Sequence, residues 1–482
     1  MEETTYIMLK ILFVSSEVSP YAKSGGLGDV AGSLPKALKN NGVDVRVVFP
    51  KYKTIKDEYT KSAEFVGSYK IKLEWREQSA SVYKLQSEVP TYVIENDYYF
   101  SNRDGYYGYN DDGERFAFFC KAALDLLNII DFVPDVIHCN DWQTGPVCVY
   151  AKDYYSRYLP LSNIKTLFTI HNIQYQGICG RNILGIMGLN DGYFTSDKLE
   201  FNGMVSFMKA GIVYADRVST VSHTYSHEIQ TGYYGYGLDG LLRARKNDLS
   251  GIVNGVDYSQ TDPATSKLIY KNFDVNDISG KKENKKKLQE ELGLPVKDVP
   301  VISLISRLVD QKGINLVIDA IGEILSKDVQ LIILGTGDGR YEYILKEFAY
   351  RHPDKISANI MFDNTLAQKI YASSDIFLMP SLFEPCGLGQ LFAMSYGTVP
   401  VVRTTGGLVD TVSEYNYDTK EGNGFTFHDY IASGMMWALN NAIHAYYTDD
   451  WNNIVKNALN TKFSWDNSAK EYIKLYEKII EK

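Results

Sequence analysis

The sequence predicts an α/β protein built from two doubly wound domains with parallel sheets. Short apolar runs rich in β-branched residues alternate with longer runs that have helical spacing. This alternation is typical of parallel sheets, and it occurs in two blocks of similar length. Glycine-rich stretches directly follow several of the expected strands. The 482 residues are enough for two large α/β domains, at roughly 150 residues or more for each.

The first block supplies the strands and helices of the expected N-terminal domain. Its apolar, β-rich runs predict strands at Ile11–Ser15, Val43–Phe49, Thr91–Ile94, Val136–Cys139, Thr166–Ile170 and Arg217–Val221. Helical spacing between them predicts helices at Leu27–Asn40, Glu114–Ile129 and Leu199–Tyr214.

The second block repeats the pattern. Strands are expected at Val301–Ile305, Gln330–Leu334, Asn359–Phe362, Ile376–Met379 and Val399–Val402. Helices are expected at Ile314–Leu325, Tyr341–Tyr350, Leu366–Ala372 and Gln390–Tyr396.

The boundary between the domains is expected near Gly251–Asp257. One domain then covers residues 8–252 and the other residues 253–465. Residues 466–482 stand apart, because Asn467–Lys482 has the pattern of an amphipathic helix.

Charge and cysteine spacing exclude several classes of function. The formal net charge of −9 argues against binding nucleic acid through bulk electrostatics. No segment approaches the ~20 apolar residues of a membrane span, and the first apolar run, Ile11–Val14, is too short for a signal peptide. The five cysteines have no C-x-x-C spacing. We therefore expect reduced thiols, a cytoplasmic protein, no metal or cofactor, and neither a nucleic-acid nor a membrane partner.

The stretch Ser381–Gln390 is the strongest single candidate for a ligand site. It connects an expected strand to an expected helix, which is where doubly wound sheets bind ligands. Backbone N–H groups at the helix start suit an anion such as phosphate, and this start is formed by Cys386, Gly387, Leu388 and Gly389. Glu384 would repel a phosphate, so we expect it to bind a hydroxyl of the same ligand or to face developing positive charge. An ordinary loop with a solvated glutamate is the alternative.

A second glycine-rich loop follows the first expected strand. Gly25 and Gly26 allow close backbone approach to a ligand, while Lys23 adds an ammonium and Asp29 a carboxylate. The loop has neither the G-x-G-x-x-G pattern nor the Gly-Lys-Ser/Thr ending of a P-loop. A purely structural turn therefore remains open.

Polar side chains follow two further strands of the first domain. Asp141 and Trp142 come directly after one strand, and His171 with Asn172 after the next. Carboxylate, imidazole and amide groups at one sheet edge favour a hydroxyl-rich ligand. A structural role for His171 is the alternative.

Two cations follow the first strand of the second domain. Arg307 and Lys312 are five residues apart, on a loop that ends at Gly313. Both can bind a diphosphate, arginine as a fork and lysine as a point charge. The alternative is ordinary surface charge.

Together these motifs resemble the bacterial glycogen synthases and plant starch synthases. The stretch Lys23–Leu27 is similar to the family's Lys-x-Gly-Gly-Leu signature. The remaining motifs follow in the family's order: His138–Gln143, His171 with Asn172, Tyr236–Leu242, Asn254–Asp257, Arg307 with Lys312, and Glu384–Leu388. The resemblance spans nearly the whole chain, from Ile11 to about Trp465.

This resemblance implies a two-Rossmann glycosyltransferase fold (GT-B), with the two domains facing a central cleft. It implies transfer of glucose from ADP-glucose to the non-reducing end of an α-1,4-glucan, with glycogen or a malto-oligosaccharide as acceptor. The anomeric configuration is retained and ADP is released. The resemblance also implies that the helix at 466–482 crosses back to the N-terminal domain.

The resemblance assigns roles to the N-terminal candidates. Lys23 and the Gly25–Gly26 backbone would meet the donor phosphates, and Asp29 would support their loop. His171 would position the donor glucose near its 6-hydroxyl, with Asn254 nearby. Asp141 would lie beside the reacting centre and the acceptor.

On the C-terminal side, Arg307 and Lys312 would neutralise the leaving diphosphate. Glu384 would hold the donor glucose hydroxyls, helped by the backbone amides of residues 386–389. Phe362 stands where the family has a tyrosine that stacks on the nucleobase, and Gly389 stands where some relatives have threonine. These two departures leave the nucleotide preference open.

Three alternatives remain at this point. A related enzyme of the same fold would use UDP-glucose, or would act on a small sugar acceptor as sucrose synthase does. A non-catalytic glucan-binding protein is the third. The tyrosine-rich loop Tyr98–Tyr109 is a candidate acceptor surface, or else it packs against the first domain.

Overall fold

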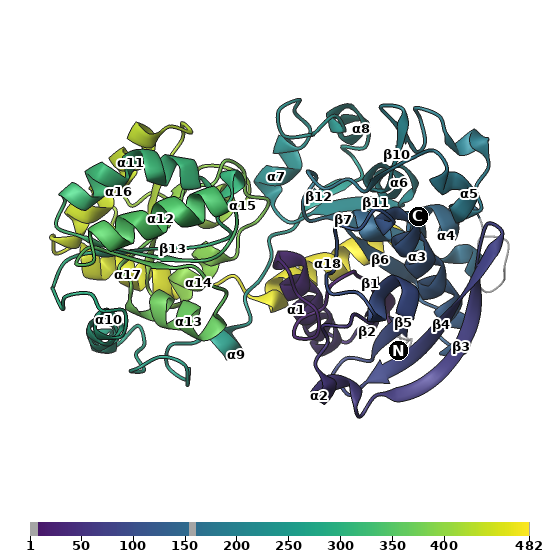
Figure 1. Cartoon of the computed structure of the whole chain (residues 1–482), viewed down its shortest axis with the longest axis horizontal. Helices are drawn as coiled ribbons and strands as arrows, with labels where there is room; N and C mark the ends of the chain where they lie inside the picture. Colours follow the sequence, from purple (N-terminus) through teal and green to yellow (C-terminus); the bar gives the residue numbers. More distant parts are fainter. Residues whose placement is uncertain (1–7, 154–160, 482) are drawn as a thin grey trace, which may run out of the picture. The chain divides into compact units, whose positions relative to one another are not determined.

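The computed structural model describes residues 8–153 and 161–481. It divides into two compact units (Figure 1). The first unit contains the chain up to Gly255 together with the segment from Trp465 onward, and the second unit is Val256–Ser464. Asn254, which the sequence analysis placed at the start of the second domain, thus belongs to the first unit.

The first unit is organised around a nine-stranded sheet in the order β12-β11-β7-β6-β1-β2-β5-β4-β3. The parallel strands are β1 (Lys10–Val14), β2 (Asp44–Pro50), β5 (Thr91–Glu95), β6 (Val136–Asn140), β7 (Lys165–Ile170), β11 (Arg217–Thr220) and β12 (Leu249–Gly251). Two antiparallel strands, β3 (Glu64–Leu73) and β4 (Arg76–Leu85), extend one edge.

Helices cover both faces of this sheet. The longer helices are α1 (Gly26–Asn40), α3 (Asp112–Ile129), α4 (Gly145–Asp153), α6 (Phe207–Tyr214) and α18 (Trp465–Ile480). In Figure 1, α1 and α18 lie on one side of β1 and β6, and α3 and α4 lie on the other. The shorter helices are α2 (Asp57–Thr60), α5 (Ile183–Met187), α7 (His223–Glu228) and α8 (Asp239–Ala244).

The prediction of a helix at Leu199–Tyr214 is wrong for the first half of that range. Residues there form a hairpin of two short strands, β9 (Glu200–Phe201) and β10 (Met204–Ser206), and β10 also pairs with β8 (Ile178–Cys179). The turn is Asn202-Gly203, and both residues have positive φ, 52° and 78°, as this type of two-residue hairpin requires. The helix begins only at Phe207, where the Ser206 hydroxyl accepts a hydrogen bond from the Lys209 N–H.

The second unit contains a six-stranded, all-parallel sheet in the order β15-β14-β13-β16-β17-β18. The strands are β13 (Val301–Ile305), β14 (Gln330–Leu334), β15 (Ile356–Asn359), β16 (Ile376–Met379), β17 (Val399–Arg403) and β18 (Phe425–Phe427). The strand expected at Asn359–Phe362 is therefore displaced, because pairing with β14 ends at Asn359. Phe362 lies beyond the sheet and is 86% exposed.

Helices also lie on both faces of the second sheet. They are α9 (Tyr258–Thr261), α10 (Ser279–Glu291), α11 (Ile314–Ser326), α12 (Gly339–Arg351), α13 (Asn364–Ser373), α14 (Gly389–Ser395), α15 (Gly407–Thr411), α16 (Ala432–Tyr446) and α17 (Trp451–Asn460). Figure 1 shows α11 and α12 on one side of β13, and α13 and α14 on the other. The predicted fold class, α/β with two doubly wound parallel sheets, is confirmed.

Each sheet has a point at which the strand order reverses. In the first unit this point lies between β1 and β6, and in the second it lies between β13 and β16. Neighbouring loops diverge to opposite faces at such a point, which opens a crevice at the carboxyl ends of the strands. The loops after these four strands carry the glycine loop at Lys23, Asp141, the Arg307–Lys312 pair and Glu384.

The last helix, α18, is an integral part of the first unit. It packs against α1, β6 and β7, and it appears in Figure 1 as the yellow helix beside α1. The hydroxyl of Tyr476 lies 2.7 Å from Nδ1 of His138, and both side chains are fully buried. Burial holds the pKa of His138 well below its usual value, so the imidazole is neutral.

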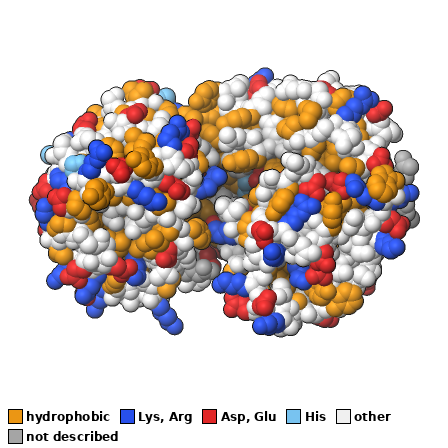
Figure 2. Space-filling view, in the orientation of Figure 1, with side chains coloured by type: hydrophobic (Ala, Val, Ile, Leu, Met, Phe, Trp, Pro, Cys, Tyr) orange, Lys and Arg blue, Asp and Glu red, His pale blue; other side chains and the backbone are white. Residues whose placement is uncertain are grey.

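The surface charges, the cysteines and the possible metal ligands were each inspected in the described residues. Figure 2 shows acidic and basic side chains intermixed on the visible face of each unit. All five cysteines are free thiols. Within residues 8–153 and 161–481, no three His, Cys, Asp or Glu side chains gather in a way that would hold a metal ion. None of the helices in those ranges combines the length and apolar character needed to cross a membrane.

Candidate active site

A buried carboxylate holds the glycine loop after β1. Glu17 is only 3% exposed, and it accepts hydrogen bonds from the backbone N–H of Ser24 (2.5 Å), the Ser24 hydroxyl (2.7 Å) and the N–H of Gly25 (3.3 Å). The Tyr107 hydroxyl donates a fourth, at 2.7 Å. The loop conformation therefore depends on an acceptor that lies inside the protein.

The outer side of the same loop is open to solvent. Lys23, Gly25 and Gly26 are exposed at the N-terminus of α1. A Cβ atom at Gly25 would meet nothing within 4 Å, so packing inside the protein does not require a glycine there. The Lys23 ammonium lies 2.7 Å from Asp29, whose pKa burial raises against the opposing effect of the lysine.

Asp141 follows β6 in a strained backbone conformation. Its φ of 57° and ψ of −180° are rare for any residue other than glycine. Surrounding bonds hold it there: Oδ1 accepts from the N–H of His171 at 2.7 Å and of Asn172 at 3.3 Å. Burial raises the pKa of Asp141 to about 7, although those two N–H groups act to lower it.

His171 follows β7 and is neutral. Burial lowers its pKa to about 3. Its Nε2 lies 2.9 Å from Oδ1 of Asn140, whose amide nitrogen donates to the carbonyl of Val14. Because that oxygen can only accept, Nε2 carries the proton and Nδ1 keeps a lone pair that can accept a hydrogen bond from a hydroxyl group.

Two asparagines belong to the same unit. The Oδ1 atom of Asn172 accepts from the N–H of Gln174 at 3.0 Å, which fixes the turn after His171. Asn254 is 5% exposed, and its Oδ1 has no hydrogen-bond partner among the described residues. A buried acceptor without a donor is costly, so a ligand hydroxyl that reached Asn254 would relieve that cost.

In the second unit, the loops after β13 and β16 meet in an ion pair. Nζ of Lys312 lies 2.5 Å from Oε2 of Glu384, which also accepts from the Ser381 hydroxyl at 3.1 Å. Glu384 is 5% exposed, and the lysine compensates its buried charge. Arg307 is exposed and makes a long bond, 3.4 Å, to the side chain of Gln311.

The backbone after Glu384 is held from inside. The Gln390 amide donates to the carbonyls of Cys386 (3.1 Å) and Gly387 (3.0 Å), and Gly387 has a φ of +75°. Gly389 is the first residue of α14. Gly406 and Gly407 follow β17. A glycine is required at Gly406 by packing, because a Cβ atom there would lie 1.9 Å from the carbonyl oxygen of Glu384.

The comparisons with known proteins cover nearly the whole chain. Residues 10–244 match the family "Starch synthase catalytic domain", and residues 281–460 match "Glycosyl transferases group 1". The chain is 49% identical to the glycogen synthase of Clostridium novyi over 479 residues, 98% of this chain and 100% of that one. It is 51% identical to the glycogen synthase of Thermotoga maritima over 489 residues, 98% and 99% of the two chains. The chain belongs to the glycogen and starch synthase family.

The solved structures agree with this membership. The catalytic domain of starch synthase IV from Arabidopsis thaliana, solved with ADP and acarbose bound, superposes with a TM-score of 0.92 at 33% identity. That match covers 99% of this chain and 100% of the other, and it confirms the expected GT-B fold class. A sucrose-phosphate synthase from Thermosynechococcus elongatus shares the fold, with a TM-score of 0.63 at 17% identity over 98% and 99% of the chains. As a member of the glycogen and starch synthase family, the chain is a hexosyltransferase.

The structure brings the predicted residues of this family into two sets, one in each unit. The first set gathers at the ends of β1, β6 and β7 and comprises Lys23, Gly25, Gly26, Asp29, Asp141, His171 and Asn172, with Asn254 in the same unit. The second gathers at the ends of β13 and β16 and comprises Arg307, Lys312, Glu384, Cys386, Gly387, Leu388 and Gly389. Phe362 belongs to the second unit but lies beyond β15, with its ring exposed.

Sequence reasoning missed the residues that hold these groups in place. Glu17 supports the glycine loop, and Asn140 fixes the tautomer of His171. Glu17 lies two residues after one predicted strand, and Asn140 directly follows another. This position was the signal that could have pointed to them. Their roles depend on contacts with residues 7 and 31 positions away, which no local pattern reveals.

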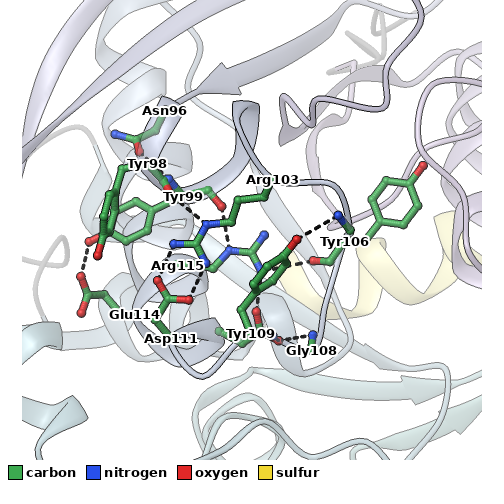
Figure 3. Close-up of polar contacts among 12 residues, drawn as sticks. Asn96, Tyr98, Tyr99, Arg103, Tyr106, Gly108, Tyr109, Asp111, Glu114 and Arg115 are labelled. Atoms are coloured by element: carbon green, nitrogen blue, oxygen red, sulfur yellow. Dashed lines mark hydrogen bonds and ion pairs between the residues drawn. The ribbon is translucent and has the colours of Figure 1, made fainter.

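The tyrosine-rich loop is largely a packed scaffold, which favours the second of its two interpretations. Figure 3 shows Arg103 and Arg115 among its tyrosines. Arg115 is fully buried and donates to the carbonyl of Tyr99 at 2.7 Å, while both Arg103 terminal nitrogens lie 2.6 Å from the Asp111 carboxylate. The loop reaches the site through Tyr107, by its bond to Glu17.

Proposed function

We propose that this chain transfers glucose from ADP-glucose to the non-reducing end of an α-1,4-glucan, with retention at the anomeric carbon and release of ADP. The acceptor is glycogen or a malto-oligosaccharide, and the setting is the cytoplasm. The observation that carries the proposal is the full-length likeness to a starch synthase solved with ADP and acarbose bound. The relatives at about half identity are glycogen synthases.

In the proposed reaction, the second unit binds the donor. Arg307 and Lys312 neutralise the diphosphate as it leaves, and backbone amides of residues 386–389 add to this stabilisation. Glu384 holds the donor glucose by its hydroxyls. Its ion pair with Lys312 supports this assignment, because the pair keeps a buried carboxylate beside a cation before any donor arrives. The exposed ring of Phe362 stacks on the nucleobase.

The first unit supplies the remaining contacts. Lys23 and the exposed Gly25–Gly26 backbone meet the donor phosphates, and Asp29 orients the lysine. Nδ1 of His171 accepts a bond from the glucose 6-hydroxyl, with Asn172 and Asn254 beside it. Asp141 faces the reacting centre and the acceptor.

The chemistry needs a stabilised leaving group and a nearby carboxylate. The anomeric carbon gains positive charge as its bond to the phosphate oxygen breaks, and a carboxylate stabilises that charge. The departing phosphate oxygen takes the proton of the acceptor hydroxyl, so no histidine base is needed. The neutral state of His171 agrees with a role in positioning, because an imidazole with a pKa of about 3 is a poor proton acceptor.

Incorporation of labelled glucose into glycogen tests the proposal. ADP-glucose and UDP-glucose are supplied in parallel, without added metal. We expect strong transfer from ADP-glucose, and a loss of at least about 100-fold in kcat for Glu384→Gln, as removal of a group that stabilises a transition state typically causes. Glu347→Gln, on the exposed face of α12, is the matched control. Transfer from UDP-glucose alone would overturn the donor assignment, and full activity of Glu384→Gln would overturn the site.

A further inference from the structure

One helix of the second unit has a solvent-facing side without charged residues. From Tyr430 to Thr448 the sequence contains no Asp, Glu, Lys or Arg, and this segment includes all of α16. Exposed and half-buried side chains recur at helical spacing along one side of α16 and at its end. We call them the α16 stripe: Ser433, Trp437, Asn440, Asn441, His444 and Tyr447. Surface helices typically carry charged residues on the side that faces the solvent, so the α16 stripe differs from an ordinary helix surface.

The opposite side of α16 fixes the stripe in place. Ala438, Leu439 and Ala442 are fully buried there. The helix packs on α11, beside which it appears in Figure 1, and on β17 and β18. The backbone beneath the stripe is therefore held by the core of the second unit. At about 1.5 Å per residue, the stripe extends for about 20 Å from Ser433 to Tyr447.

Two large aromatic rings are exposed on the stripe. Trp437 is 59% exposed and Tyr447 is 60% exposed, whereas tryptophan and tyrosine usually bury most of their surface. The ring of Tyr447 packs edge-to-face on Tyr446, with ring centroids 5.1 Å apart. Both exposed rings thus offer surface to a ligand, and a neighbouring ring supports one of them.

The polar side chains between these rings have unused hydrogen-bonding groups. Asn440, Asn441 and His444 make no side-chain hydrogen bond with any other residue that the structure describes. An asparagine amide offers two donors and one acceptor. A ligand with hydroxyl groups, which both donate and accept, would match these amides.

The chemistry of the stripe favours a sugar chain over a second protein. Aromatic faces pack against the C–H faces of sugar rings, and amides bond their hydroxyl groups. The stripe has no charged side chain to hold a phosphate or a peptide carboxylate. A second copy of this chain would need to bury about 800 Å² on each partner around an apolar centre. The centre of the stripe is instead Asn440 and Asn441, whose amides would lose their water in such a contact.

We propose that the α16 stripe is a second glucan-binding site, which binds a chain of the acceptor polymer other than the chain being extended. The inference rests on the proposed function, since a glycogen particle presents many chains at once. Binding at the stripe holds the enzyme on the particle and raises the effective concentration of chain ends. Its residues take no part in bond making or breaking.

Affinity electrophoresis in gels that contain glycogen tests the stripe without requiring catalysis. We expect the gel to retard the wild type, and the apparent Kd for glycogen to rise at least about threefold in Trp437→Ala, as loss of one aromatic contact implies. Trp75→Ala is the matched control. Trp75 is 80% exposed in the first unit, but it lies between Glu74 and Arg76. The Trp75→Ala variant should bind glycogen like the wild type.

Kinetics with a short and a long acceptor separates the stripe from the active site. Maltotriose is too short to tether the enzyme, so Trp437→Ala should keep the wild-type kcat and the wild-type KM for this acceptor. With glycogen as acceptor, its KM should rise at least about threefold. An equal rise in the KM for maltotriose would mean that Trp437 acts on the active site, and this result would overturn the inference.

The remaining outcomes distinguish this inference from the proposed function. Equal glycogen affinity of the wild type and Trp437→Ala, or no retardation of the wild type, would overturn the stripe. A lower molar mass of Trp437→Ala in light scattering would identify the stripe as an interface between copies of this chain, and would also overturn it. Absence of wild-type transfer from ADP-glucose would overturn the proposed function, while electrophoresis would still decide whether the stripe binds glucan.

Discussion

Glu17 lies beneath the glycine loop without a cation to balance it among its described hydrogen-bond partners. Four neutral donors, two backbone and two hydroxyl, satisfy it instead. The loop is therefore shaped before any phosphate arrives. Lys23 is left to pair with Asp29 and faces the solvent.

Replacing this carboxylate should weaken donor binding selectively. In Glu17→Gln, an amide NH₂ would face N–H groups that need an acceptor, at a cost of about 1–3 kcal/mol. We expect the KM for ADP-glucose to rise roughly tenfold, with little change in the KM for glycogen. Steady-state kinetics against each substrate checks this. Glu58→Gln, at an exposed position, is the control, and an unchanged donor KM in Glu17→Gln would show that the loop is held by other contacts.

Asp141 should make the stability of the protein depend on pH. Its pKa is about 7 in the folded protein, against 3.8 for an unperturbed aspartate, so the folded state binds this proton more tightly than the unfolded state does. The contribution of this group to the free energy of unfolding is fully present below about pH 4 and is lost as the pH rises to about 7. At roughly 1.4 kcal/mol per pKa unit, the loss is a few kcal/mol.

Asp141→Asn should therefore be more stable than the wild type at pH 8 and similar to it at pH 4.5, while its activity falls. Asparagine keeps an oxygen to accept from His171 and Asn172, but it cannot ionise. Urea unfolding midpoints at both pH values measure the difference. A constant difference between the two proteins across this range would contradict the raised pKa.

Among the elements, buried parallel strands were predictable and edge strands were not. β13 and β14 are mostly apolar, with one polar residue each, and their predicted bounds agree with the structure. Most residues of β3 and β4 are exposed or half-buried, and the strands contain many polar residues, so a search for apolar runs passes over them. The hairpin at Asn202-Gly203 did carry a local signal, but helical spacing after Leu199 masked it.

The attachment of α18 gives a prediction at this scale. Tyr476→Phe removes the hydroxyl that contacts Nδ1 of His138 and leaves a buried polar nitrogen without its partner. The expected cost is about 1–3 kcal/mol, seen as a lower melting temperature in calorimetry. Tyr350→Phe, on the exposed face of α12, should melt like the wild type. Equal melting of the two variants would mean that another group takes over the bond.

For the whole molecule, the sequence predicted the fold class, and it placed the candidate site residues after the strands at which the strand order reverses. Reversal of strand order at β1/β6 and β13/β16 explains why, since short motifs after those strands fall at one sheet edge. The Lys312–Glu384 pair joins residues 72 positions apart, so only the folded sheet could reveal it. The strand expected at Asn359–Phe362 is displaced because the end of β15 depends on pairing with β14.

The two units should differ in their ability to fold alone. Val256–Ser464 has a hydrophobic core of its own, so this fragment should unfold cooperatively. Residues 1–255 lack α18, which buries Ala469, Tyr472, Tyr476 and Ile479 against the first unit. That fragment should bind ANS and lose its near-UV circular dichroism, and joining α18 to it through a flexible linker should restore both properties. Native behaviour of residues 1–255 alone would show that the helix is dispensable.

The position of α18 in the sequence also delays the completion of the first unit during synthesis. Trp465, where the helix begins, is synthesised about 210 residues after Gly255. At ~5–20 residues per second, the N-terminal unit waits roughly 10–40 s for its last helix. During that interval, the faces of α1, β6 and β7 that α18 will cover are open to chaperones. The first unit is thus the first to be synthesised and the last to have all its helices.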